Sequence, residues 1–562
     1  MANLAWVGSS LPAWLRFRAA LADPLPAQAA LLTGSLQRNQ DTLVGRELGF
    51  GAMLAAARRS TDPGRALIDV YRARIPLRGY DDLEPYIRRI RSGDPNILTA
   101  DPVCRLVPSS GSTAARKLLP LTPGLRREFA RAVSPWIADL HLTHRGAAGG
   151  RAYWSISPAL RQDAQDAVPI GFDDDSEYLG RTANALARAV LAVPDAISRV
   201  TDPDAFRYLS LLFLVRARDL RLISVWHPSF LERLLDSLPA WMPRIAGDIA
   251  LGTLSPPGTV APDVLAALAR RMHPDPRRAR ELERFASLET FEPRRLWPDL
   301  AVVSCWADGA AAPHADRLAR ALPAVAIQGK GLVATEGIVS IPFGGARPLA
   351  ILSHFFEFID EAGEPRLAHE LEEGAEYSVA LTTAGGLYRY RLGDRIVVNG
   401  RVRRTPSIGF IGKDDRISDL FGEKLSDGFV AGVLARLFDG GPAPRFAMLA
   451  PAPAEPARDP GEASGATREP GNPATDGLAY TLFVEIDRDV SELAARLERE
   501  LRRNPHYAWC VDLGQLRPAR VVRVGPHADR AYVDACLARG SRLGDIKPAA
   551  LDRRTDWHTV FK

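Results

Sequence analysis

The sequence predicts an α/β protein with a large N-terminal domain and a small α+β domain at its C-terminal end. The chain has 562 residues, more than one hydrophobic core usually organises. Residues 296–330 alternate strand, helix and strand (LAVVSCWADG, DRLARALP, AVAIQGKG), which is typical of a parallel sheet with crossover helices. The pattern changes near residues 413–416. We therefore place the two domains at residues 1–415 and 416–562.

The N-terminal domain begins with residues 1–100, which we expect to be mostly helical. Residues 101–122 then switch to a short strand, a loop of small residues and a second apolar run. Residues 176–250 have helical spacing, including the stretch FRYLSLLFLVRARDLRLISVW. Residues 345–412 are shorter strand-like pieces separated by Gly and charged turns, which favours an antiparallel or barrel-like element.

The C-terminal domain contains an unusual segment, residues 451–477 (PAPAEPARDPGEASGATREPGNPATDG). Its Pro, Ala, Gly and Glu content cannot bury enough apolar surface to order the chain, so we expect a disordered loop. The strand-like runs RFAMLA and AYTLFVEI flank it, which places the loop inside the domain.

Composition excludes several classes of protein. Hydrophobic residues make up 46% and charged residues 25%, as in ordinary globular proteins, and the net charge is only +5. The one dense basic stretch, residues 270–284, lacks aromatic residues and is interrupted by Glu281 and Glu283, which indicates a solvated helix face instead of a nucleic-acid site. Four scattered cysteines, no secretory signal and no apolar run of membrane length lead us to expect a cytoplasmic protein that does not bind a membrane.

Lysine is rare in this chain. Of 72 lysines and arginines, six are lysines: Lys117, Lys330, Lys413, Lys424, Lys547 and Lys562. A lysine ammonium is a compact charge on a flexible stem, and an arginine fork seldom replaces it at a functional site. We therefore interpret Lys117, Lys424 and Lys547 as functional candidates and Lys562 as a surface residue.

The first motif is a loop of small residues after a strand. Its members are Ser109, Ser110, Gly111, Ser112 and Thr113, and it ends at Lys117. Backbone N–H groups and hydroxyls in such a loop can bind a polyphosphate, to which a lysine adds charge. The spacing is not that of a Walker loop. A plain loop is an equally good explanation of this motif taken alone.

The second motif, residues 329–337, follows the strand AVAIQ and contains Ala334, Thr335 and Glu336. Its glycines match a dinucleotide-binding pattern, but Thr-Glu-Gly indicates a turn and not a helix, which argues against hydride chemistry. A carboxylate at this point can hold Mg²⁺, and a hydroxyl can bind phosphate.

Three further segments contain candidate residues. Asp394 follows Gly393 in LYRYRLGD, where a carboxylate can accept both hydroxyls of a ribose, although Asp is also a common turn residue. Residues 412–416 have the composition of a hinge, and Lys424 follows soon after. Lys547 lies on a Gly-flanked loop, residues 539–548, near the C-terminus. Plain surface loops explain the last two segments equally well.

Taken together and in this order, these segments resemble adenylate-forming enzymes of the ANL superfamily. More specifically, the chain is similar nearly end to end to the Gretchen Hagen family, the auxin-responsive acyl acid amido synthetases that conjugate plant hormones to amino acids. The resemblance is carried by the motifs above and by YDDLEPYIRRIRSGDPNILTADP, KLLPLT, IAGDIALGTLS, LYRYRLGD and RGSRLGDIKP. The high arginine content favours a bacterial member. The resemblance implies a large adenylate-forming domain with parallel sheets and a barrel-like element, followed by a small mobile domain.

The resemblance also implies roles for residues. ATP binding falls to Ser109, Ser110, Gly111, Ser112, Thr113, Ala334, Thr335, Glu336 and Asp394. Glu336 is the implied Mg²⁺ contact, Lys424 contacts the α-phosphate region, and Lys547 lies on the mobile domain; Lys117 is a third catalytic candidate. The phosphate loop departs from the pattern at Ala114 and Arg116, and Leu332 replaces a frequent aromatic residue, so we expect Phe410 to stack on adenine.

Four residues are candidates for acyl-acid binding. The implied acyl-binding helices correspond to the region of Arg216, Trp226 and His227, and Trp306 precedes the second motif. Ordinary packing explains each of these residues equally well.

The activity that the resemblance implies is ATP-dependent acyl acid amido synthesis. A small carboxylic acid is adenylated with release of pyrophosphate, and its acyl group passes to the amine of an amino acid, with rotation of the small domain between the steps. The implied cofactors are ATP and Mg²⁺, and a monomer is favoured. A thiol or another amine as acceptor, or a non-catalytic nucleotide- or acyl-acid-binding protein, remain alternatives. The sequence does not name the acid or the acceptor.

Overall fold

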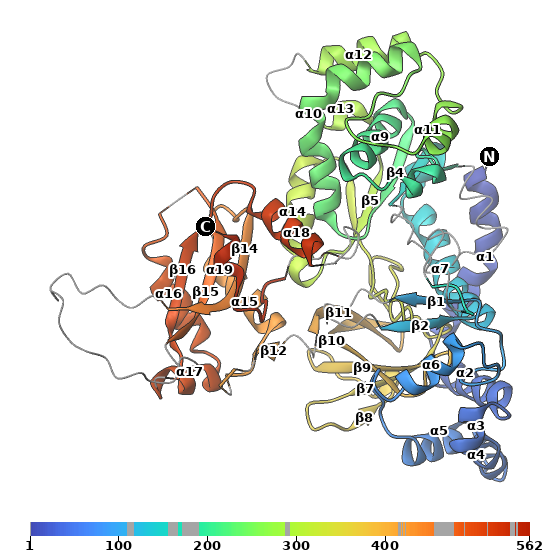
Figure 1. Cartoon of the computed structure of the whole chain (residues 1–562). Helices are drawn as coiled ribbons and strands as arrows, with labels where there is room; N and C mark the ends of the chain where they lie inside the picture. The colour runs from blue at the N-terminus through green and yellow to red at the C-terminus, as the bar shows by residue number, and fades with distance from the viewer. Residues whose placement is uncertain are drawn as a thin grey trace, which may run out of the picture. The chain divides into compact units, whose positions relative to one another are not determined.

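The computed structural model is a mixed α/β protein, as predicted (Figure 1). It describes residues 2–108, 117–155, 167–170, 190–286, 293–413, 417–418, 420–421, 423–454, 477–487, 489–513, 515–539, 546 and 549–561. The chain divides into two compact units. The larger unit comprises Met1–Leu392 with Ile396–Phe410, and the smaller comprises Gly393–Arg395 with Ile411–Lys562.

The larger unit begins with helices, as the sequence predicts. They are α1 (Ala2–Ala20), α2 (Pro24–Asn39), α3 (Leu43–Glu47), α4 (Phe50–Ala57), α5 (Pro63–Arg74) and α6 (Glu84–Arg91). Three begin at side-chain caps: Asp23, Thr42 and Asp62 each accept a hydrogen bond from a backbone N–H in the first turn of their helix. Their apolar faces join one large core with the strands that follow later in the chain.

A hairpin and a long helix come next. Strands β1 (Arg105–Pro108) and β2 (Leu118–Leu121) pair antiparallel, and Pro108 lies opposite Leu118. Helix α7 (Pro123–Thr143) follows, capped by Thr122, which accepts from the Leu125 N–H and donates to the carbonyl of Ala384. Thr122 thereby ties the start of α7 to the turn that precedes the LYRYRLGD motif.

A four-stranded sheet with parallel pairing forms the centre of the next region. Its order, β3-β4-β5-β6, follows the chain. The strands are β3 (Arg151–Trp154), β4 (Leu220–Ser224), β5 (Val302–Cys305) and β6 (Ala326–Gly329). Among the described residues between β3 and β6, the helical elements are η3 (Asp195–Arg199), α9 (Pro203–Arg216), α10 (Pro228–Leu251), α11 (Pro262–Ala269), α12 (Pro276–Ala286), α13 (Pro293–Leu296), η4 (Gly309–Ala311) and α14 (Ala312–Ala321). The element η1 (Arg145–Gly149) precedes β3.

Two expectations in this region need correction. Helical spacing was expected throughout residues 176–250, but β4 interrupts the helices, because a short, buried parallel strand has the same apolar content as a buried helix turn. The basic stretch was expected to be fully solvated, but Arg278 on α12 is 4% exposed. Its guanidinium donates to the carbonyls of Val215 and Leu296 and to Glu281, so this arginine is part of the core.

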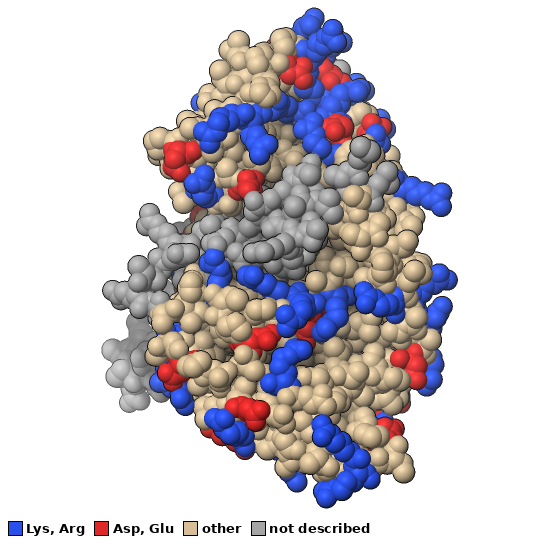
Figure 2. Space-filling model, turned by 90° about the vertical axis from the view of Figure 1, so that its right-hand side faces the viewer, with Lys and Arg blue, Asp and Glu red and all other residues tan. Residues whose placement is uncertain are grey.

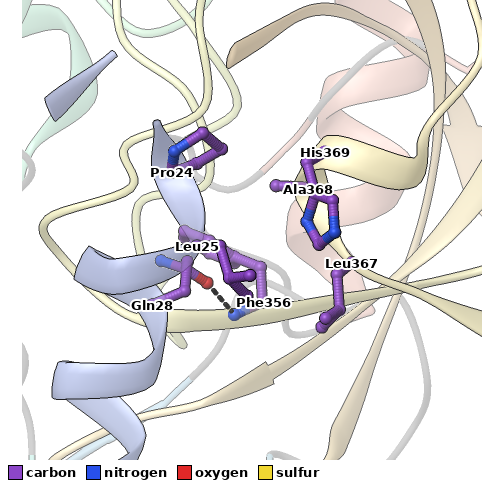
Figure 3. Close-up of a pocket in the computed structure, with 7 residues that line it drawn as sticks. All are labelled: Pro24, Leu25, Gln28, Phe356, Leu367, Ala368 and His369. Atoms are coloured by element: carbon purple, nitrogen blue, oxygen red, sulfur yellow. Dashed lines mark hydrogen bonds between the residues drawn. The ribbon is translucent and has the colours of Figure 1, made fainter. Parts of the chain in front are cut away.

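The strand-rich segment forms a five-stranded sheet, in the order β11-β10-β9-β7-β8. Its strands are β7 (Phe355–Ile359), β8 (Pro365–Arg366), β9 (Glu376–Thr382), β10 (Tyr390–Val402) and β11 (Thr405–Lys413), with η5 (Ala368–Glu370) between β8 and β9. Gln28 of α2 clamps the start of β7: its amide donates to the carbonyls of Ile351 and His354 and accepts from the Phe356 N–H, each at 2.8 Å. Figure 3 shows Gln28 beside a small pocket between α2, β7 and η5.

The smaller unit is built on a three-stranded sheet, in the order β14-β15-β16. Its strands and helices are β12 (Ile417–Ser418), β13 (Leu425–Ser426), α15 (Asp427–Leu437), β14 (Phe446–Pro453), β15 (Leu478–Glu485), α16 (Leu493–Leu501), α17 (Pro505–Asp512), β16 (Arg517–Arg523), α18 (Ala528–Ala538) and α19 (Trp557–Val560). Leu482 and Val484 join a core with α15, α16 and α17, whereas Phe483 joins a core with α18 and α19. Helices therefore cover both faces of the sheet.

The proline-rich segment starts later than expected. Pro451, Ala452 and Pro453 belong to β14, where they pair with β15, so the disorder expected from residue 451 is wrong for these three. Residues 455–476 lie outside the described part of the chain.

The distribution of surface charge and the hydropathy of the helices are those that the sequence composition predicts. On the face shown in Figure 2, basic side chains occur at the top, middle and bottom, with acidic side chains among them. Over the described ranges, no helix combines enough length and hydropathy to cross a bilayer.

Candidate active site

The carboxyl edge of the parallel sheet gathers several of the candidate residues. Strands β4, β5 and β6 end at Ser224, Cys305 and Gly329, and the chain continues from them into Trp226, Trp306 and Lys330. Ligands of open α/β sheets usually bind beyond the carboxyl ends of the strands. This edge is therefore the best-placed part of the larger unit for a substrate.

Aromatic rings line this edge. The ring centroids of Trp226 and Trp306 are 5.6 Å apart, and the Trp306 N–H donates to the Trp226 carbonyl at 2.9 Å. The Nζ atom of Lys330 lies 4.6 Å from the centroid of the Trp226 ring. The two predicted tryptophans therefore lie together, and the structure adds Lys330, which the sequence interpretation counted among the rare lysines without giving it a role.

Cys305 is the last residue of β5 and is not a nucleophile. Its side chain is fully buried, and burial raises the pKa of the thiol to about 11. A thiol with this pKa stays protonated near neutral pH.

His227 lies at the same edge as the N-cap of α10. Its Nδ1 accepts from the Ser229 N–H at 3.2 Å, so in the neutral ring the proton is on Nε2. The ring is 5.0 Å from that of His314, whose Nδ1 is 2.5 Å from Glu232. Burial would raise the pKa of Glu232, but His314 and Arg317 outweigh it and hold this pKa below its usual value.

Arg216, predicted as a fourth acyl-site residue, lies elsewhere. It ends α9 just before β4 begins, at the amino end of the strand whose carboxyl end leads to Trp226. Its Nη1 donates to the carbonyl of Arg271 at 2.7 Å. The structure thus separates Arg216 from the tryptophans by the length of β4.

The second nucleotide motif forms a small hairpin directly after β6. Val333 and Ile338 form an antiparallel bridge, and Ala334 and Gly337 exchange backbone hydrogen bonds of 3.1 and 3.2 Å. Thr335 and Glu336 are the two residues at its tip. The turn expected from Thr-Glu-Gly is confirmed, and no helix of a dinucleotide-binding fold follows.

A buried histidine and carboxylate hold this hairpin in place. The Ile338 N–H donates to Nε2 of His354 at 3.1 Å, so Nδ1 carries the proton and donates to Glu128 at 2.8 Å. The same oxygen of Glu128 accepts from the Ala384 N–H at 2.9 Å. A Cβ on Gly337 would lie 2.9 Å from His354 Nε2, so close packing requires glycine there. Glu128 of α7 thus connects the hairpin to the turn before the LYRYRLGD motif.

Phe410, expected to stack on adenine, lies near the carboxyl end of β5. Its N–H donates to Asp308 at 3.1 Å, and its ring packs at Gly309, where a Cβ would lie 3.5 Å from the ring. Leu332 is only partly exposed and packs against the main core.

Lys117 lies immediately before β2 and is half-buried. The phosphate-loop candidates Ser109, Ser110, Gly111, Ser112 and Thr113 lie outside the described residues, as does Lys547. Since β1 and β2 pair up to Pro108 and Leu118, the two ends of the phosphate loop are neighbours.

In the smaller unit, Asp394 is 3% exposed and its carboxylate lies 3.0 Å from the Nζ atom of Lys413. Another rare lysine therefore contacts the predicted ribose-binding residue. Lys424 is exposed and has a φ of 46°, a left-handed conformation uncommon outside glycine. Its carbonyl accepts from the Asn504 side chain at 3.3 Å.

Few of the described side chains could coordinate a divalent cation. The described ranges contain no group of three or more His, Cys, Asp and Glu side chains able to hold a metal ion. Glu336 is a carboxylate, the kind of ligand that Mg²⁺ prefers, and Mg²⁺ usually takes one or two carboxylates together with phosphate oxygens. Glu336 fits that pattern.

Comparison with known protein families shows three matches, all to domains of one family, which together cover most of the chain. Residues 14–327 match the GH3 family N-terminal domain, residues 348–413 the GH3 family central domain and residues 471–555 the GH3 family C-terminal domain.

Curated proteins and solved structures are also similar to this chain. A probable indole-3-acetic acid-amido synthetase of Oryza sativa subsp. japonica is 26% identical over 74% of this chain and 73% of its own. A jasmonoyl-L-amino acid synthetase of Nicotiana attenuata is 24% identical over 62% and 64%. The GH3.15 acyl acid amido synthetase structure matches with a TM-score of 0.79 at 18% identity, covering 98% of this chain and 95% of its own. A 2-hydroxyisobutyryl-CoA ligase matches with a TM-score of 0.50 at 12% identity, covering 95% and 90%.

Proposed function

Because this chain belongs to the GH3 family, we propose that it is an ATP-dependent acyl acid amido synthetase. It adenylates a small carboxylic acid, releases pyrophosphate and transfers the acyl group to the amine of an amino acid. The observation that carries the proposal is the hairpin that presents Thr335 and Glu336 directly after β6, beside an aromatic edge of the parallel sheet. The names of two relatives, an indole-3-acetic acid-amido synthetase and a jasmonoyl-L-amino acid synthetase, support it.

The first step joins two anions, a carboxylate and the α-phosphate of ATP. Positive charge must offset their repulsion and stabilise the charge that develops in the transition state. In this proposal Lys117, Lys424 and Lys547 supply that charge. Mg²⁺ held by Glu336 and phosphate oxygens would neutralise further negative charge. A preorganised contact of this kind is typically worth about 3–4 kcal/mol, or about 10²–10³ in rate.

The remaining nucleotide contacts follow from the family pattern. The phosphate loop, residues 109–113, binds the phosphates, Asp394 accepts the ribose hydroxyls, and Phe410 packs on adenine. ATP must then compete with Lys413 for Asp394, since this lysine contacts the carboxylate at 3.0 Å.

The acyl acid binds at Trp226, His227 and Trp306. Because Trp226 and Trp306 are only partly buried, their indoles offer an apolar surface that a ring or chain can cover. The acceptor amine enters after rotation of the C-terminal domain, residues 416–562, about the hinge at 413–416. We place this reaction in the cytoplasm, where scattered cysteines stay reduced, and assign it to a monomer.

The test is release of pyrophosphate from ATP with a panel of aryl, indole and fatty acids, each with and without mixed amino acids. Release that requires an acid and rises with amino acids supports the proposal and names the substrate class. Acid-dependent release that ignores amino acids indicates a thiol or another amine as acceptor. No release with any acid, while ATP still binds, would favour a non-catalytic binding protein.

A further inference from the structure

We infer that Lys330 selects the acyl acid by binding an acceptor group, such as a hydroxyl or second carboxylate, that an aryl acid carries in addition to its reacting carboxylate. The inference rests on the proposed function, because it concerns the substrate class of the same site. Lys330 would be a binding residue, with no part in the adenylation chemistry.

The first argument is the position of the ammonium. Lys330 is the residue after β6, yet its Nζ donates to the hydroxyl of Ser224 at the end of β4, at 2.7 Å. Strand β5 lies between these two strands in the sheet, so the side chain reaches across the carboxyl edge. Its backbone N–H donates to the Cys305 carbonyl at 2.7 Å, which fixes the base of the side chain. The charge therefore lies at the edge where substrate is expected.

The second argument is the aromatic surroundings of Nζ. Two indoles approach it, Trp226 with its ring centroid at 4.6 Å and Trp136 at 5.6 Å. Trp136 is held rigidly, because its Nε1 donates to Gln328 of β6 at 3.0 Å. Trp226 also packs against Trp306, with ring centroids 5.6 Å apart. An aryl ring placed on these indoles would bring its substituent toward the ammonium.

The third argument is energetic. Lys330 is 5% exposed, and in such a low-dielectric position a charge-assisted hydrogen bond is much stronger than in water. A site built to bond a polar substrate group rejects an analogue without that group more strongly than an apolar pocket rejects a missing methylene. An ammonium is a compact charge with rotatable donors, suited to one acceptor atom, whereas arginine, which this chain uses almost everywhere else, presents a planar fork.

The test compares matched acids on wild-type protein and on the variant Lys330→Met. The acids are phenylacetate, 4-hydroxyphenylacetate and 4-carboxyphenylacetate, and the readouts are the Kd by isothermal titration calorimetry and kcat/KM for pyrophosphate release. We expect wild-type protein to prefer at least one substituted acid about 10- to 100-fold, as for a hydrogen bond to a charged group, and Lys330→Met to reduce that preference to within a few-fold. The affinity for phenylacetate should change less than the affinity for the preferred substituted acid.

A second variant tests whether misfolding, instead of the loss of the ammonium, explains the result. Ser224→Ala removes the hydroxyl that orients Nζ and leaves the packing of the indoles unchanged, so it should lower the preference several-fold with a Tm close to that of wild type. If both variants retain the full preference, or if Lys330→Met weakens all three acids equally, the inference is wrong; the second result would mean that Lys330 binds the reacting carboxylate. Calorimetry separates the two proposals, because a preference in binding without any pyrophosphate release refutes the proposed function and supports the role of Lys330.

Discussion

Arg389 provides the sharpest test of how the LYRYRLGD motif works. Its guanidinium forms two bonds of 2.9 Å with Glu357 and donates to the carbonyls of Arg72 and Ile75. Arg389 is 4% and Glu357 1% exposed, so this ion pair is in the core of the larger unit. The side chain at the centre of the motif therefore supports the fold, and only Asp394 at its end is a nucleotide candidate.

We expect Arg389→Met to lower the free energy of unfolding by about 3–5 kcal/mol, because it leaves Glu357 as a buried charge. The remaining cation near Glu357 is Arg72, whose Nε lies 3.3 Å away and is itself only partly buried. Arg389→Lys should lose about 1.5–3 kcal/mol, since an ammonium cannot form the paired bonds of the fork. The double variant Arg389→Met with Glu357→Leu should recover much of the loss, because the buried charge is gone.

Urea denaturation of the four proteins, followed by tryptophan fluorescence, measures these differences. A matched control is Arg65→Met, which breaks surface ion pairs with Asp69 on α5 and with Glu370 and should cost less than about 1 kcal/mol. If Arg389→Met costs no more than this control, or if the double variant is less stable than Arg389→Met alone, the reasoning about a buried carboxylate that has lost its bidentate partner is refuted.

Three further predictions concern the site. His354→Phe should speed hydrogen exchange of the Ile338 amide about 10- to 100-fold, because that N–H loses its acceptor; unchanged exchange measured by NMR or mass spectrometry would contradict the role of His354. The pKa of Glu232 is lowered in the folded protein, so its ionised carboxylate stabilises the fold above the unfolded pKa of about 4.3, and this stabilisation is lost as the pH falls through the folded pKa. The Tm difference between wild type and Glu232→Gln should therefore be large at pH 7 and small near pH 3. An equal Tm difference at both pH values would refute this role of Glu232. Lys424→Arg should leave the Tm unchanged, since the side chain is exposed, and should reduce pyrophosphate release about 10²–10³-fold, whereas an unchanged rate would remove Lys424 from the site.

Local patterns along the chain were enough to predict much of the fold. The alternation at 296–330 predicted β5, α14 and β6, and turn residues predicted the hairpin at Thr335 and Glu336. β4 was missed because LRLIS, between two helices, has no period that distinguishes a buried strand from a helix. Arg278 was missed because its acceptors are carbonyls of Val215 and Leu296, which only the folded chain brings to it.

The sequence predicted the motifs of the candidate site but not the residues that hold those motifs in place. Trp226 and Trp306 were chosen from the sequence and lie in contact. His354 and Glu128 carry no local signal, since they meet across 226 residues of sequence. Lys330 was the exception: its rarity and its place directly after a strand were visible, but its partner Ser224 is 106 residues away.

The pairing between the last residue of β14 and the first residue of β15 has a practical consequence. The two strands pair until Pro453 lies opposite Leu478, and the Ala454 N–H then bonds to the Gly477 carbonyl at 2.5 Å. The chain thus leaves and re-enters the sheet at adjacent points. The entropic cost of closing a loop between these two points rises by only about 0.6 kcal/mol for each doubling of the loop length. Residues 455–476 are accordingly the place to graft a fluorescent reporter or an affinity tag, or to substitute a two-residue turn for crystallisation.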